Sequence, residues 1–108
     1  MAALIPGAPI NIGKTAATSD GSAPLLDSNQ LELIVGAAEY WRLYLFAPAS
    51  SVIYLTQQSP AHESGIVLPA GVTTFFDYRR ADLELLSLLD DNEASTQVLI
   101  SVAPLVSW

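Results

Sequence analysis

The chain has 108 residues, of which 51% are hydrophobic and 14% are charged, and its formal net charge is −7. The length fits one domain, and the charged share is well below the usual value of about a quarter, so we expect a partner to cover part of the apolar surface. Eleven acids against four bases argue against binding to nucleic acid or to an anionic membrane, and the absence of cysteine excludes disulfides and thiolate metal sites.

Residues 1–24 are predicted to form an extended N-terminal arm, ahead of a folded domain over residues 25–108. The segment is interrupted by prolines and glycines and contains the small polar run TAATSDGS, so no helical or strand period persists in it. We expect at most one short strand, around 10–12. Apolar side chains in such an arm predict docking on its own body or on a neighbour. They are Leu4, Ile5, Ile10 and Ile12.

The stretch GAPINIGKTAA ends like a phosphate-binding P-loop, with the tripeptide Gly13-Lys14-Thr15. A P-loop places four residues between its first glycine and the Gly-Lys pair, after a strand and before a helix. Here five residues separate Gly7 from Gly13, no apolar strand precedes them, and the following residues are poor helix formers. We therefore interpret the tripeptide as a coincidence, with Lys14 either solvated or in contact with an acidic neighbouring subunit.

Strand patterns dominate from Leu25 onward. LELIV (31–35) is apolar on one face, and EYWRLYLF (39–46) alternates between Trp41, Leu43 and Leu45 on one side and polar or aromatic residues on the other. The turn APASS and the strand VIYLT (52–56) follow. We interpret 39–46 and 52–56 as a β-hairpin.

Three further strands are predicted at 66–71, 72–78 and 96–105, with Val98, Ile100 and Val102 facing inward. A polar loop at 57–65 precedes the first of these strands, which ends in a Pro-Ala-Gly turn, and a turn at 90–95 precedes the last. Residues 81–90 fit a helix and a strand about equally, and the all-β surroundings favour a strand. Short strands at this spacing predict an all-β fold, a small antiparallel β-sandwich or barrel of jelly-roll-like form.

Two loops carry residue types that could serve catalysis or metal binding. His62 is the only histidine and lies beside Glu63, with Ser59 and Ser64 nearby, but closeness along a loop is no evidence that these groups converge in a catalytic geometry. Asp90, Asp91, Asn92 and Glu93 lack the alternating spacing and the central glycine of a calcium loop. We expect a surface loop and a solvated turn, and we predict no enzyme activity, no cofactor and no metal.

Arginine and aromatic residues form the best candidate for a partner interface, since both are frequent at interface hot spots. Arg42 shares its strand face with three aromatic residues, where it can stack on a ring. Arg79 and Arg80 precede the acidic stretch ADLE and can pair with Asp77 or Asp82, or with another subunit. With the apolar residues of the arm, the predicted interface also contains Tyr40, Arg42, Tyr44, Phe46, Arg79 and Arg80.

The stretch from Trp41 to Ile100 resembles small all-β structural proteins of tailed bacteriophages. The motifs are YWRLYLF, the aromatic strand in ASSVIYLT, the loop and turn of ESGIVLPAGVTTFF, and the final pair DLELLSLL and TQVLISV. Such proteins often carry an asparagine after the first strand, where this chain has Phe46-Ala47-Pro48.

The resemblance implies a virion component assembled in the host cytoplasm. The expected function is that of a capsid decoration, or cement, protein that binds the major capsid protein on the outside of the shell and associates with itself, as a trimer in the form we expect. The alternative is a tail, collar or receptor-recognition module of the virion.

Overall fold

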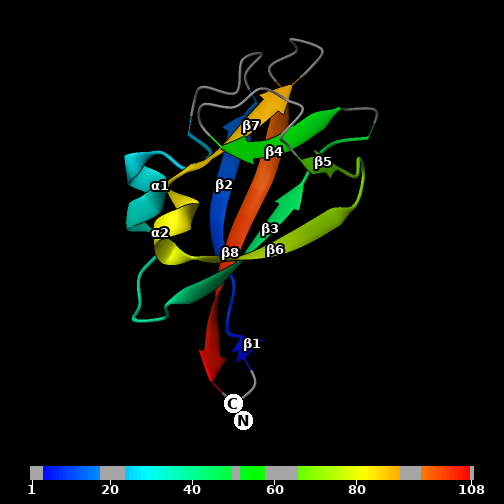
Figure 1. The fold of residues 1–108 in the computed structure, drawn as a ribbon. Coiled ribbons are helices and arrows are strands. Elements are labelled where there is room, and N and C mark those ends of the chain that lie inside the picture. Colours follow the sequence, from blue (N-terminus) through cyan, green and yellow to red (C-terminus); the bar gives the residue numbers. More distant parts are fainter. Residues whose placement is uncertain (1–3, 18–23, 50–51, 58–65, 91–95, 108) are drawn as a thin grey trace.

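The computed structural model describes residues 4–17, 24–49, 52–57, 66–90 and 96–107 as an all-β fold of two antiparallel sheets, which confirms the predicted fold class (Figure 1). Two short helices accompany the strands. The strands are β1 (Leu4–Pro6), β2 (Ile10–Ala16), β3 (Tyr40–Phe46), β4 (Ile53–Gln57), β5 (Ile66–Leu68), β6 (Thr73–Arg79), β7 (Leu86–Asp90) and β8 (Gln97–Ser107), and the helices are α1 (Ser28–Glu32) and α2 (Arg80–Leu83).

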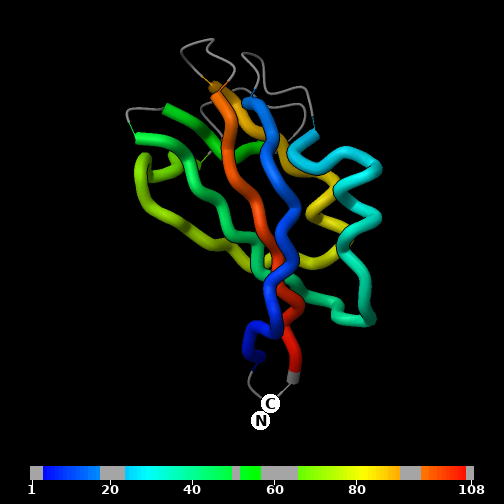
Figure 2. The backbone as a smooth tube through the Cα atoms, turned by 180° about the vertical axis from the view of Figure 1, so that it is seen from behind, coloured from blue at the N-terminus to red at the C-terminus, as the bar shows by residue number. Residues whose placement is uncertain are grey.

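The larger sheet has the order β1-β8-β3-β6, and β2 also pairs with β8. The long strand β8 is therefore the centre of the larger sheet although it follows the other strands in sequence, and Figure 2 shows β2 beside its first part, residues 97–102. The smaller sheet, with the order β5-β4-β7, packs across one face of the larger sheet. The hydrophobic core lies between the two sheets.

Strand β3 has the predicted alternation. Trp41, Leu43 and Leu45 are buried, whereas the residues between them are half-buried. The indole nitrogen of Trp41 donates a hydrogen bond of 3.0 Å to the carbonyl of Ala38, so its one polar group is satisfied. The predicted strands at 66–71, 72–78 and 96–105 are also confirmed as β5, β6 and β8, and the inward residues of β8 are buried as expected: Val98, Ile100 and Val102.

The structure does not confirm an arm separate from the sheets. Both β1 and β2 pair with β8, and the short strand expected at 10–12 is the seven-residue strand β2. Ile12 is 6% exposed, so it belongs to the core of its own chain. A bulge hides this strand in the sequence: the register shifts between Asn11 and Gly13, and Gly13 has a φ of 108°. An extra residue breaks the period of two that identifies a strand.

The predicted hairpin of 39–46 and 52–56 is wrong. Strand β3 pairs with β6 and β8, whereas β4 belongs to the other sheet, between β5 and β7. Between them, Ala47 forms a parallel bridge with Ala70, and its carbonyl accepts a hydrogen bond of 2.8 Å from the Gly71 amide. Alternation shows which side of a strand is buried, but not which strand lies beside it.

The strand predicted at 31–35 is also wrong, because Leu31 and Glu32 end helix α1, Leu33 is its C-terminal cap, and the next two residues are not in a strand. Asp27 and Gln30 form a capping box: the Gln30 amide donates to the Asp27 carboxylate at 2.7 Å, and the Asp27 amide donates to the Gln30 side chain at 2.9 Å. This local signal outweighs the strand preference of the apolar residues. Ile34 is buried after the helix, whereas Leu33 and Val35 are exposed.

Residues 81–90 adopt both of the structures that the sequence allowed. The first part is one helical turn, α2, which buries Leu83, and the second part is strand β7. All five residues of β7 are buried. The Leu25 amide donates to the Leu86 carbonyl at 2.7 Å and so pairs with the start of β7. The predicted loop at 57–65, beyond Gln57, and the turn at 90–95, beyond Asp90, lie outside the described residues.

Candidate interaction surface

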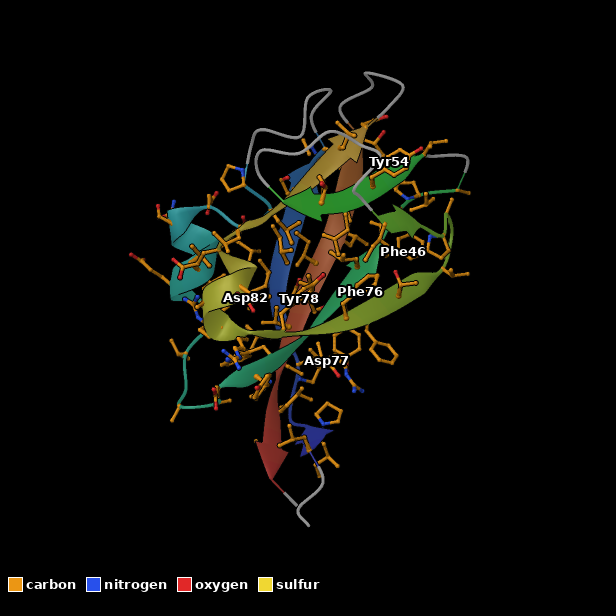
Figure 3. The ribbon with its side chains drawn as sticks, viewed as in Figure 1. Phe46, Tyr54, Phe76, Asp77, Tyr78 and Asp82 are labelled. Carbon is orange, nitrogen blue, oxygen red and sulfur yellow. The ribbon has the colours of Figure 1, made fainter. Side chains whose placement is uncertain are left out.

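The side of the larger sheet that faces away from the core carries five of the ten predicted interface residues, and we call it the outer face. The register brings alternate residues of three strands side by side: Tyr44 of β3 lies opposite Phe75 of β6 and opposite Ser101 of β8. Figure 3 shows Asp77 on this side of β6, with Phe76 and Tyr78 on the core side. The outer face consists of Tyr40, Arg42, Tyr44, Phe46, Thr73, Phe75, Asp77, Arg79, Leu99 and Ser101.

An ion pair stacked on an aromatic ring organises the middle of the outer face. Arg42 makes two hydrogen bonds to Asp77, Nε to Oδ1 at 2.8 Å and Nη2 to Oδ2 at 3.1 Å. Its guanidinium carbon lies 4.3 Å from the centre of the Phe75 ring. The hydrogen bond with Asp77 raises the pKa of Arg42, against a smaller opposing effect of burial. The ion pair thus holds the guanidinium in place against the ring.

A second cation lies on a tyrosine at the end of the strands. The Arg79 guanidinium carbon is 5.8 Å from the centre of the Tyr40 ring, and Nε donates a hydrogen bond of 3.4 Å to the Tyr40 hydroxyl. This hydrogen bond is the main cause that raises the pKa of Arg79. Of the two predicted partners of Arg79 and Arg80, Asp77 pairs with Arg42 instead. The negative charge of Asp82 adds a smaller contribution that also raises the pKa of Arg79. Arg80 instead lies 3.8 Å from Glu84.

The aromatic residues leave a broad apolar area in the open. The rings of Tyr44 and Phe75 are 6.2 Å apart between centres and inclined by 55°. Phe75 is 54% exposed and Leu99 is 45% exposed. A shallow groove of about 290 Å³ runs between Tyr44, Phe46 and Leu99. An apolar centre with arginine and tyrosine around it is the composition found at the core of protein–protein interfaces.

The structure separates the predicted interface residues into two groups. Five of them meet on the outer face, and Arg80 follows at its end in α2, where it also donates to the Leu31 carbonyl at 3.4 Å. The four residues from the predicted arm do not join them. Leu4 and Ile5 are exposed on β1, Ile10 is half-buried, and Ile12 is in the core.

Phe75, Asp77 and Leu99 of the outer face are not among the predicted interface residues, although Asp77 was expected to pair with Arg79 or Arg80. The signal was present, because the alternation of TTFFDY places Phe75 and Asp77 on one face of β6. It could not be used without the register that pairs β6 with β3, since the two strands are far apart in the chain. A contact between such strands is set by the fold rather than by local pattern.

The P-loop-like tripeptide lies within β2, where Gly13, Lys14 and Thr15 pair with Ile100, Leu99 and Val98. Extended backbone in a ladder does not wrap around a phosphate, so this placement supports the interpretation as a coincidence. Lys14 is exposed, and the Thr15 hydroxyl donates to the Leu25 carbonyl at 2.8 Å.

The loop residues considered for catalysis or metal binding fall mainly outside the described residues, as His62, Glu63, Asp91, Asn92 and Glu93 do. The expectation of a solvated turn is wrong for Asp90. It ends β7, is 2% exposed, and accepts a hydrogen bond of 2.8 Å from the Thr96 hydroxyl.

Over the described ranges, no three acidic or histidine side chains gather in a way that could hold a metal ion. The helices in the same part of the chain are too short and too polar to cross a membrane. No family model, no curated protein and no solved structure matches the chain. An inference about function must therefore come from the residues and geometry of the outer face.

Proposed function

We propose that the protein is a structural component of a virus particle, a capsid decoration protein that binds the major capsid protein and stabilises the shell. The observation that carries this proposal is the outer face: a domain of this size leaves an apolar, arginine-bearing side of its main sheet uncovered by any described element. The phage context comes from the resemblance of the strand and turn motifs. The protein acts by adhesion, without catalysis.

The outer face has the properties that adhesion to a protein surface requires. Covering side chains such as Phe75 and Leu99 removes apolar area from water, with about 1.5–3 kcal/mol available from each fully buried side chain. Arg42 is already fixed by Asp77, so little side-chain freedom is lost when a partner contacts it. Binding that is specific to the assembled shell stabilises it by mass action.

The test is to heat shells with and without the protein and to compare their melting temperatures. We expect a higher melting temperature with the wild-type protein and binding at least about tenfold weaker for Phe75→Ser, because the variant removes the largest exposed hydrophobic side chain of the outer face. Leu85→Ser is the matched control, since Leu85 is 52% exposed but lies outside the outer face. It should bind like the wild type.

Equal melting temperatures with and without the protein would contradict the proposal. The number of copies per particle separates the shell from the alternative location. Copies over the whole shell support decoration, whereas a few copies at one site would assign the protein to the tail or collar. Equal loss of binding for both serine variants would move the contact away from the outer face.

A further inference from the structure

Strand β6 is an open edge of the larger sheet. It pairs with β3 on one side, and within the described part of the chain no strand pairs with it on the other. Its seven residues, TTFFDYR, contain no proline, lysine or glycine. Proteins commonly use proline, lysine or a bulge to keep such an edge from pairing with another chain. An edge without proline, lysine or glycine is suited to strand addition.

The hydrogen bonds define which backbone groups are available at this edge. The Arg80 amide donates to the Glu39 carbonyl at 2.9 Å, and these residues continue the register of β3 and β6. In an antiparallel ladder, residues alternate between pointing both backbone groups to the partner and pointing both away. Thr74, Phe76 and Tyr78 therefore bond to β3. The outward set consists of Thr73, Phe75, Asp77 and Arg79.

We propose that β6 pairs with β6 of a second copy of this chain, antiparallel and about a two-fold axis at Phe76. In this register, Thr73 lies opposite Arg79 of the second copy, and Phe75 lies opposite its Asp77. All four outward residues of each strand then find a partner, so every free amide and carbonyl of the edge is satisfied. The two larger sheets become one continuous sheet across the axis.

The side chains favour a copy of the same strand in this register. Phe76 is half-buried and meets its own counterpart, which gives an aromatic contact on the axis. No like charges lie directly opposite each other, and each Asp77 keeps its own Arg42 as a counter-charge. A shift of two residues in either direction leaves fewer residues of each strand paired, and in one direction it also places Asp77 opposite Asp77.

The first experiment uses the absence of cysteine in the chain. In the proposed dimer, residue 76 and its counterpart form a non-hydrogen-bonded pair of an antiparallel ladder. The Cα atoms of such a pair are about 4.5 Å apart, which permits a disulfide. We expect Phe76→Cys to form a covalent dimer under mild oxidation. Thr74→Cys, on the same face of the same strand, is the control, because residue 74 of one copy lies opposite residue 78 of the other and is far from residue 74 of that copy. Equal cross-linking of both variants, or none for a folded Phe76→Cys, would overturn the proposal.

A second measurement does not depend on the folding of the cysteine variant. Thr73 is exposed and lies opposite Arg79 of the second copy, so Thr73→Lys should weaken the dimer and Thr73→Glu should strengthen it, each by about tenfold over the two symmetric contacts. Analytical ultracentrifugation reads out both dissociation constants. A wild-type protein that stays monomeric, equal constants for the two variants, or a trimer without cross-linking at residue 76 would overturn the proposal.

This inference concerns the edge of the larger sheet, whereas the proposed function depends on its outer face. The two can therefore fail separately. A protein that dimerises through β6 but does not raise the melting temperature of shells retains the edge and loses the function. A protein that raises the melting temperature of shells but does not cross-link at residue 76 retains the function and loses the edge.

Discussion

Single residues on the outer face are held by one another rather than by the core. Arg42 of β3 hydrogen-bonds to the carboxylate of Asp77 and stacks on the ring of Phe75, both in β6, so the three side chains hold one another in place. The side chain of Arg42 is 23% exposed and that of Asp77 is 42% exposed. A bidentate pair that is partly shielded from water contributes more than a typical surface ion pair.

Asp77→Asn tests this arrangement at the residue scale. We expect the melting temperature to fall by about 2–5 °C, because the charge of Arg42 loses its counter-charge. Glu32→Gln removes a similar charge from an exposed position and is the control. The difference between the two should shrink in high salt, since salt screens the pair. Identical melting curves would contradict the role of the pair.

The sequence predicted part of this face for a clear physical reason. Alternation along β3 separates the buried Trp41 from Arg42 and Tyr44 without any knowledge of the fold. Phe75 and Asp77 needed the pairing of β3 with β6, which local pattern does not contain. The half-buried strand thus reveals its own exposed side, but not the neighbouring residues that complete the site.

At the scale of elements, the sequence predicts strands well where the period of two is unbroken and fails where a local hydrogen bond decides. Strands β3, β6 and β8 alternate cleanly and were found, whereas β2 was shortened by its bulge. The apolar residues of 31–35 were assigned to a strand although the capping box of Asp27 and Gln30 starts a helix there. Capping signals in a short segment deserve more weight than apolar content.

Asp27→Ala tests how much the cap contributes to α1. We expect a loss of about 1 kcal/mol in urea unfolding, because the variant removes the acceptor for the Gln30 amide. Asp27→Asn keeps an oxygen at the same position and should cost much less. If alanine and asparagine lower the stability equally, the carboxylate acts through its charge rather than through the cap.

At the scale of the whole molecule, the fold closes around its last strand. Three strands from the first half of the sequence pair with β8, so the larger sheet cannot be completed until β8 has been synthesised. Pairings between such distant segments are not contained in local periodicity. For this reason the sequence predicted two packed sheets but placed β4 beside β3.

Truncation distinguishes an integral strand from the expected arm. Deleting residues 1–9 removes only β1, and we expect a folded protein with a slightly lower melting temperature. Deleting residues 1–17 also removes β2, with the core residues Ile12 and Ala17, and should abolish cooperative unfolding, because buried β8 residues lose their cover. Circular dichroism on heating measures both. A cooperative transition in the longer deletion would instead support the predicted arm, which lies ahead of the folded domain.

The ribbon of β1 and β8 has a practical consequence for how the protein can be joined to other chains. Leu4 lies directly opposite Ser107, at the narrow tip of a molecule 43 Å long (Figure 1). A linker of a few residues would therefore join residue 107 to residue 4 and produce a circular molecule. Two short linkers at the same positions would insert the domain into a surface loop of another protein. Cargo fused at either end would be displayed from the same point.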